Sequence, residues 1–196
     1  MNVFVTGGTG YIGSRLIPLL ARRGHRVLAL ARPGSESHLP GDCRAMIGNV
    51  LDPDTYAPDA AGADCLVHLA GVSRPTPAKA RQFVEVDLGS VRAYVEVRRR
   101  CEELVQASGL DATMIRPWYV LGPGHHWPYL LLPAYCIARR LPGTRETAER
   151  LGLVTLSAML ASLTHAIEQP ARGIRVIDVP GIRRLGSGES LAAAKR

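Results

Sequence analysis

Three glycines at intervals of three residues constrain this chain more than any other feature. Residues 6–13 read Thr-Gly-Gly-Thr-Gly-Tyr-Ile-Gly, between the apolar run 3–5 and a segment with helical spacing at 11–23. In such a strand-turn-helix context, Gly7 permits a tight turn and Gly10 lets the backbone approach a ligand without a Cβ. Gly13 lets the helix pack closely on the strand. The pattern predicts a βαβ unit with a phosphate site at the head of its first helix.

The free N–H groups of the first helical turn, from about Gly10 to Ile12, would point at the two phosphates of a dinucleotide, with the positive end of the helix dipole behind them. A purely structural glycine-rich turn remains the alternative. The residues that we expect to bind the cofactor in this loop are Gly7, Thr9, Gly10, Tyr11, Ile12 and Gly13.

The order of predicted elements indicates an α/β protein. Low aromatic content, 5%, with 46% hydrophobic residues suits a parallel sheet between helices. Strands are expected at 3–5, 27–31, 45–47, 65–69, 112–116 and 175–179, and helices at 11–23, 76–108 with a break near Gly89, 129–141 and 156–168. We expect a Rossmann-type doubly wound parallel sheet with a small C-terminal cap. The expected divisions are a dinucleotide-binding domain at 1–122, a substrate cap at 123–185 and a flexible tail at 186–196.

The residue after the second predicted strand bears on the choice of cofactor. An acidic side chain there would accept the ribose hydroxyls of NAD, whereas this chain has Arg32. A guanidinium suits the 2′-phosphate of NADP, so we expect NADP(H) to be preferred over NAD(H). Arg32 could also be a solvated loop residue, and Glu36 lies close by in the sequence.

Four segments resemble the extended or atypical branch of the short-chain dehydrogenase/reductase superfamily, the NAD-dependent epimerase/dehydratase-like proteins. Residues 6–13 are similar to its TGxxGxxG loop, and 68–71, His-Leu-Ala-Gly, to the strand ending that packs against the cofactor. Residues 48–50, Gly-Asn-Val, stand where the family has Gly-Asp-hydrophobe beside the adenine, and 116–124 resemble its RPxxVxGPG segment near the nicotinamide. The likeness covers about residues 1–180. It implies further cofactor contacts at Asn49, Val50, Leu69, Ala70, Gly71 and Pro117.

The resemblance also implies a catalytic pair. Residues 94–98, Tyr-Val-Glu-Val-Arg, occupy the place of the family's YxxxK motif, in which the tyrosine exchanges a proton with the substrate and the lysine lowers its pKa. Tyr94 and Arg98 are therefore the expected catalytic residues. Arg98 keeps the positive charge but not the hydrogen-bonding geometry of an ammonium. An aromatic residue on a helix face is the alternative reading of Tyr94.

A second departure from the family precedes Tyr94. The strand that ends in the family's active-site serine is expected to be missing, because Arg92-Ala93 runs directly into Tyr94. Two functions therefore stay open at this point. One is an NADP(H)-dependent oxidoreductase or epimerase-like enzyme acting on a small carbonyl or hydroxyl substrate. The other is a non-catalytic dinucleotide-binding sensor or scaffold module.

Charge and composition argue against several other classes. The net charge of +7 is compatible with a phosphate ligand, and the scattered arginines argue against nucleic acid. No metal site is expected, since the four cysteines are far apart in sequence and the His125-His126 pair lacks a third donor nearby. The apolar stretch 127–138 is too short to span a membrane. We expect a cytoplasmic protein with a small-molecule substrate, whose identity and oligomeric state the sequence leaves open.

Overall fold

The computed structural model describes residues 1–70, 99–117, 119–124, 143 and 152–193. The chain divides into two compact units. The first comprises residues from 1–71, 115–169 and 177–196, and the second residues from 72–114 and 170–176. We describe each unit by itself.

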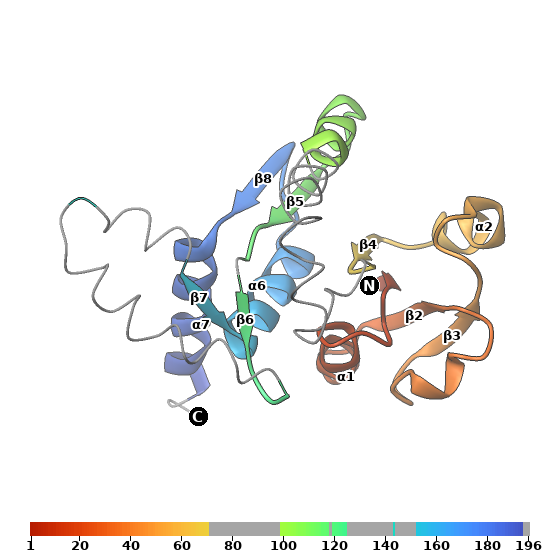
Figure 1. Cartoon of the computed structure of the whole chain (residues 1–196), viewed down its shortest axis with the longest axis horizontal. Coiled ribbons are helices and arrows are strands. Elements are labelled where there is room, and N and C mark those ends of the chain that lie inside the picture. Colours follow the sequence, from red (N-terminus) through yellow and green to blue (C-terminus); the bar gives the residue numbers. More distant parts are fainter. Residues whose placement is uncertain (71–98, 118, 125–142, 144–151, 194–196) are drawn as a thin grey trace, which may run out of the picture. The chain divides into compact units, whose positions relative to one another are not determined.

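The centre of the first unit is a four-stranded parallel sheet (Figure 1). Its strands are β1 (Asn2–Thr6), β2 (Arg26–Ala31), β3 (Arg44–Ile47) and β4 (Cys65–His68), in the order β3-β2-β1-β4. Thr6, the last residue of β1, lies opposite Leu30 and His68. The strands therefore end at a common carboxyl edge. The strand order changes direction beside β1, because β2 and β3 are added on one side of it and β4 on the other. The predicted parallel α/β sheet is confirmed.

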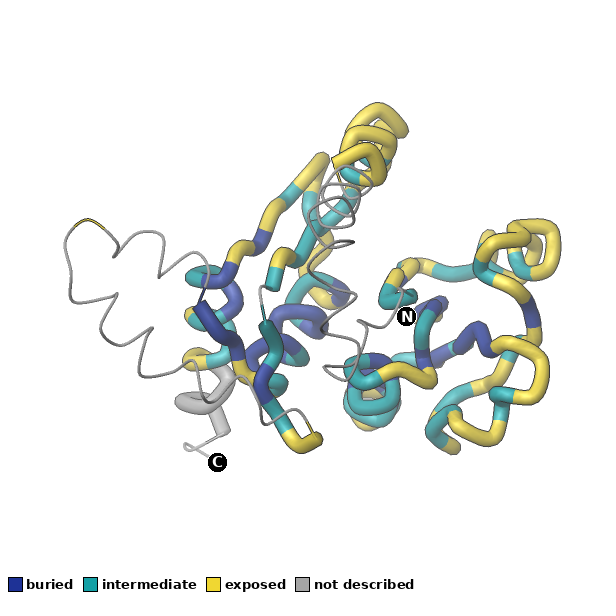
Figure 2. The backbone as a smooth tube through the Cα atoms, in the orientation of Figure 1, coloured by how far each residue is buried: buried dark blue, intermediate teal, exposed yellow. Residues whose placement is uncertain are grey.

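β1 is buried on both of its faces, as the central strand of a covered parallel sheet must be. Val3 and Val5 pack against α1 (Gly13–Arg22), while Phe4 stacks on Tyr56 with ring centroids 5.8 Å apart. In Figure 2 the neighbouring strand β2 is likewise buried over most of its length. Short elements occupy the remaining crossovers of the sheet: η1 (Glu36–His38), η2 (Pro53–Thr55) and α2 (Ala57–Ala60).

The core on the α1 side of the sheet is completed by later parts of the chain. β6 (Tyr119–Leu121) pairs in parallel with β7 (Leu153–Thr155), which leads directly into α6 (Leu156–Glu168). The Thr155 hydroxyl caps this helix by accepting the Ala158 N–H at 3.2 Å. Apolar side chains of α6 and of α7 (Val179–Ala193) join those of β1 and α1 in one buried cluster.

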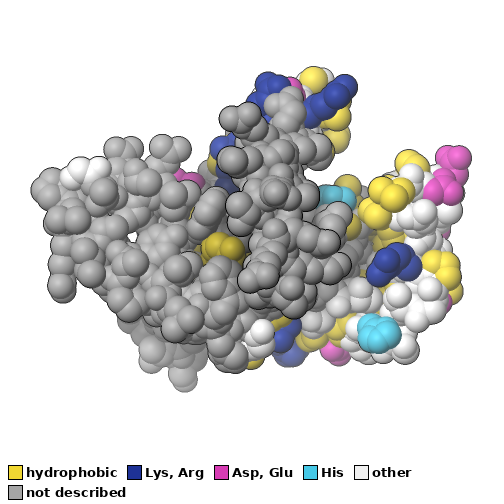
Figure 3. Space-filling model, viewed as in Figure 1, with side chains coloured by type: hydrophobic (Ala, Val, Ile, Leu, Met, Phe, Trp, Pro, Cys, Tyr) yellow, Lys and Arg dark blue, Asp and Glu magenta, His cyan; other side chains and the backbone are white. Residues whose placement is uncertain are grey.

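The second unit contains the helix at 99–107 and all but the last residue of β5 (Ala112–Ile115) and of β8 (Ile174–Ile177), which pair with each other. The Ala112 N–H donates to the Gly173 carbonyl, and the Arg116 N–H to the Ile177 carbonyl, each at 2.9 Å. The equal offset of the two bonds shows that the strands run parallel. On the face drawn in Figure 3, arginine side chains gather over the 99–107 helix.

Most predicted elements are present, and three differ. Neither β6 nor β7 was predicted from the sequence. α7 continues to Ala193, whereas residues from 186 were expected to be loose. Expected helical segments at 76–98 and 129–141 lie outside the described residues. The role of 123–185 as a substrate cap stays a prediction. In the described ranges, no helix is both long and apolar enough to cross a membrane.

The continuation of α7 has a packing reason at Gly186. A Cβ built at Gly186 would overlap the Cβ of Ala158 on α6, so the absence of a side chain lets the two helices approach closely. Two residues further along α7, a Cβ at Gly188 would meet no heavy atom within 4 Å. The polar composition of residues 186–193 therefore gave no sign of a helix, because the helix is stabilised by the close contact between Gly186 and Ala158.

We expect Gly186→Ala and Gly188→Ala to have opposite effects. The methyl at 186 would force α6 and α7 apart and lower the free energy of unfolding by about 1–3 kcal/mol. The methyl at 188 adds only helix propensity and should raise it by up to about 1 kcal/mol. Urea unfolding of both variants measures the difference. Equal effects of the two substitutions would contradict the packing of α7 on α6.

Candidate functional site

The glycine loop lies directly on the end of β4. Gly7 has φ +73°, the left-handed conformation that favours glycine, and a Cβ at this position would lie 2.6 Å from the carbonyl carbon of Leu69 and 2.7 Å from the nitrogen of Ala70. The Gly10 N–H donates to the Gly7 carbonyl at 3.0 Å and closes the turn. Leu69 and Ala70 therefore form the support on which the loop rests.

Gly13 joins this loop to α1 at close range. A Cβ at Gly13 would overlap the Gly7 carbonyl oxygen and would lie 2.8 Å from the Cα of Gly8. Both contacts are with backbone, which cannot rotate away as a side chain could. The first turn of the helix thus packs on the tight turn itself, which is the role expected of Gly13.

No side chain among the described residues caps the N-terminus of α1. The residue at the N-cap is Ile12, which offers no hydrogen-bonding side chain, and the first turn contains no acidic residue. Within the part of the chain that the structure describes, the N–H groups of Ile12 and Gly13 donate to no acceptor. Unpaired N–H groups and the positive end of a helix dipole favour an anion, and phosphate is the common one. The geometry fits the pyrophosphate of a dinucleotide.

Sequence reasoning missed Arg15, which holds the middle of the loop. Its Nη1 donates to the Tyr11 carbonyl at 2.8 Å, and its guanidinium lies 4.3 Å from the centre of the Tyr11 ring. The signal was in the sequence, because residues four apart share one face of a helix. Arg15 also brings a positive charge to the loop.

A side-chain contact ties β1 to β4 at the carboxyl edge. Thr6 Oγ1 and His68 Nδ1 lie 2.9 Å apart, and Thr6 is 2% exposed. Both residues immediately precede the segments that meet at Gly7. This pair was also missed as a site feature, since 62 residues separate it in sequence.

The predicted adenine and ribose contacts follow β2 and β3 at this same edge. Arg32 is exposed directly after β2. After β3, the Asn49 N–H donates to Thr55 Oγ1 at 3.0 Å, and Asn49 Oδ1 accepts the Leu51 N–H at 3.1 Å. The Tyr56 hydroxyl donates to the Val50 carbonyl at 3.4 Å. Asn49 and Val50 thus sit in a turn that is fixed by its own hydrogen bonds.

The other predicted site residues are placed only in part. Pro117 is half-buried and lies two residues beyond β5. Thr9 is exposed in the glycine loop. Gly71, Tyr94 and Arg98 lie outside the described residues, as does the segment in which the family's serine-bearing strand would stand.

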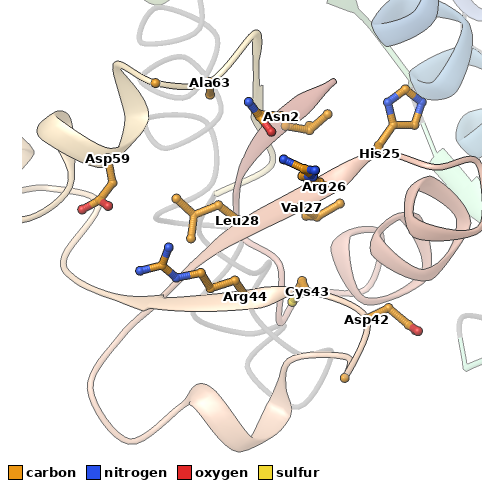
Figure 4. Close-up of a pocket in the computed structure, with 13 residues that line it drawn as sticks. Asn2, His25, Arg26, Val27, Leu28, Asp42, Cys43, Arg44, Asp59 and Ala63 are labelled. Carbon is orange, nitrogen blue, oxygen red and sulfur yellow. The ribbon is translucent and has the colours of Figure 1, made fainter.

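A pocket of about 690 Å³ lies at the opposite, amino edge of the sheet (Figure 4). Arg26 and Arg44 line it together with Asp42 and Asp59, so its charges are mixed. Cys43 also lines it, and burial, followed by the charge of Asp42, raises the pKa of this thiol. A raised pKa disfavours the thiolate that a nucleophile needs. The carboxyl edge therefore remains the candidate site.

Comparison with known proteins gives one family over the first half of the chain. The sequence profile of the NAD dependent epimerase/dehydratase family matches residues 3–108. A ceramide reductase of Caulobacter vibrioides is 24% identical over 94% of this chain and 66% of its own length. A 4-hydroxy-2-methyl-3-oxo-4-farnesyl-3,4-dihydroquinoline-1-oxide ketoreductase of Stigmatella aurantiaca is 28% identical over 78% of this chain and 45% of its own length. The chain thus spans less than two thirds of these relatives.

Solved structures agree on the fold. The Bordetella bronchiseptica enzyme WbmH, solved in complex with NAD+, superimposes with a TM-score of 0.60 at 17% identity, over 98% of this chain and 81% of WbmH. At this identity the likeness shows the fold alone, a Rossmann-like doubly wound sheet.

We expect the Thr6–His68 contact to appear as a coupling energy. Thr6→Val keeps the shape of the side chain and removes the hydroxyl, and His68→Ala removes its partner. If the contact is a hydrogen bond, unfolding free energies of the two single variants and the double variant should be non-additive by about 0.5–1.5 kcal/mol. Urea unfolding of the wild type, the two single variants and the double variant measures this coupling energy. Additive effects would show that the hydrogen bond does not form in solution.

Proposed function

Because the chain belongs to the NAD-dependent epimerase/dehydratase family, we propose that it binds NAD(P) at the carboxyl edge of the β3-β2-β1-β4 sheet. The observation that carries this proposal is the N-terminus of α1 beside the glycine-rich loop, where no described residue caps the helix or pairs with the N–H groups of Ile12 and Gly13. These two N–H groups would hold the pyrophosphate. Thr9, Gly10 and Tyr11 would line the loop around it.

We propose NADP(H) as the preferred cofactor. Arg32 stands at the end of β2, exposed at the carboxyl edge, and in the described residues no carboxylate pairs with it. A guanidinium in this place would bind a 2′-phosphate through charge-assisted hydrogen bonds. Asn49 and Val50 would lie beside the adenine, while Leu69, Ala70, Gly71 and Pro117 would line the rest of the cofactor site.

The reaction we propose is oxidation or reduction of a small carbonyl or hydroxyl substrate, with an epimerase-like reaction as a variant of it. A bound nicotinamide supplies hydride transfer in such reactions. Tyr94 would exchange the proton, and Arg98 would favour its ionised form. The names of the two relatives, a ceramide reductase and a ketoreductase, support a carbonyl substrate. A cytoplasmic location belongs to the same proposal.

A non-catalytic dinucleotide-binding module is the second candidate. The substitution of arginine for lysine at residue 98 and the direct run from residue 93 into Tyr94 favour it. Such a module would bind the dinucleotide at the same site as the proposed oxidoreductase but would not catalyse hydride transfer. Tight NADPH binding without turnover of any carbonyl in a broad panel would favour the module, whereas robust turnover would exclude it.

Calorimetric titration with NADPH and NADH tests the binding site and the cofactor preference together. We expect wild-type protein to bind NADPH more tightly than NADH. Arg32→Gln should weaken NADPH binding by at least about tenfold, because charge-assisted hydrogen bonds to the 2′-phosphate are lost. NADH binding should be unchanged. Arg26→Gln, an exposed arginine at the other end of β2, is the matched control and should change neither affinity.

The catalytic assignment has a separate test. Tyr94→Phe should abolish NADPH turnover against an accepted carbonyl substrate while leaving the calorimetric affinity for NADPH intact. The reason is that only the proton-exchanging hydroxyl is removed. Turnover that persists in this variant would remove Tyr94 from the mechanism without affecting the proposed cofactor site.

A further inference from the structure

The hydroxyl end of Tyr11 lies against a segment that follows it by more than a hundred residues. A Cβ built at Gly122, directly after β6, would overlap the Tyr11 hydroxyl oxygen. That oxygen is buried. The same Cβ would lie 3.1 Å from the Cβ of Leu156, the first residue of α6. Only a glycine at 122 leaves the tyrosine its present position.

The other end of Tyr11 is equally fixed. Its carbonyl accepts a hydrogen bond from Arg15 at 2.8 Å, and the Arg15 guanidinium covers its ring at 4.3 Å from the centre. Tyr11 therefore contacts Arg15 of α1 through its carbonyl and its ring face, and it contacts Gly122 through its hydroxyl oxygen. A displacement at the tip turns the rigid ring, so it disturbs the contact of the ring with Arg15, and the same arginine holds the Tyr11 carbonyl of the loop.

We propose that Tyr11 is a positioning residue that links the glycine loop to Gly122, so that the contact between its hydroxyl and Gly122 sets the N–H groups of Ile12 and Gly13 for a diphosphate. The inference rests on the proposed function, because it assigns the diphosphate to that loop. It adds a dependence that the loop alone does not explain. The affinity for diphosphate ligands depends on Gly122, which lies 111 residues after Tyr11 in the sequence.

A purely structural role for Gly122 predicts a different pattern of effects. A methyl group at 122 presses on Leu156 as well as on Tyr11. Strain against Leu156 would remain when the tyrosine is changed. Strain against the tyrosine would disappear in Tyr11→Phe, because removal of the hydroxyl oxygen withdraws the side chain by one C–O bond and keeps the ring under Arg15.

Four variants separate these two possibilities: Gly122→Ala, Tyr11→Phe, the double variant, and Gly41→Ala as the control. A Cβ at Gly41 meets no heavy atom within 4 Å, and its φ is not positive. We expect Gly122→Ala to weaken the binding of ADP and of NADPH by roughly tenfold, which corresponds to about 1.4 kcal/mol. The double variant should bind both ligands within about twofold of Tyr11→Phe, because the methyl group then meets no hydroxyl, and the Gly41→Ala control within about twofold of wild type. Calorimetric titration measures each affinity.

Thermal unfolding without ligand gives an independent readout. Gly122→Ala should lower the unfolding temperature by roughly 4 °C, and the double variant should recover most of that loss. If wild-type protein binds none of ADP, NADPH and NADH, the proposed function is wrong, and the unfolding temperatures alone decide on the contact. If it does bind them, an unchanged affinity in Gly122→Ala, or a methyl group at 122 that weakens binding as much in Tyr11→Phe as in wild type, overturns the link.

Discussion

The unsatisfied positive end of α1 is the interaction on which the rest of the candidate site depends. Four N–H groups at the start of any helix lack an intrahelical acceptor, and proteins usually satisfy some of them with a capping side chain. Here Ile12 occupies the capping position and the first turn carries no acidic residue. The chain keeps this pole available at the edge of the sheet where all four strands end. An anion is the natural counterpart of such a pole.

Several backbone contacts hold that pole in place. Gly7 rests on Leu69 and Ala70, Gly13 rests on Gly7, and the Thr6–His68 contact joins the two strands beneath them. None of these contacts leaves room for an additional methyl group at the glycines. Rigid support of this kind lets N–H groups act on a ligand without first being reorganised. Tyr11 and Gly122 extend the same support beyond the first βαβ unit.

The sequence predicted the features that depend on local patterns. Strands of continuous apolar residues, the helix after Gly13 and the helix at 156–168 all follow from periodicity, and the glycine loop follows from spacing. The features it did not predict arise from distant contacts. β6 and β7 are short strands that become recognisable only when they pair, and α7 continues through polar residues because Gly186 meets Ala158. The roles of Thr6 and Gly122 likewise depend on partners far away in sequence.

The shared core on the α1 side has a consequence for the order in which the protein can fold. Leu16, Ile17 and Leu20 pack in the same cluster as Val154, Leu163 and Ile182. During synthesis the apolar face of α1 therefore stays incompletely buried until residues 154–182 have been translated. Contacts of such long sequence separation slow folding and leave apolar surface open to wrong partners in the meantime. The helix that carries the candidate anion site at its N-terminus is, on its apolar face, among the last parts of the unit to be buried.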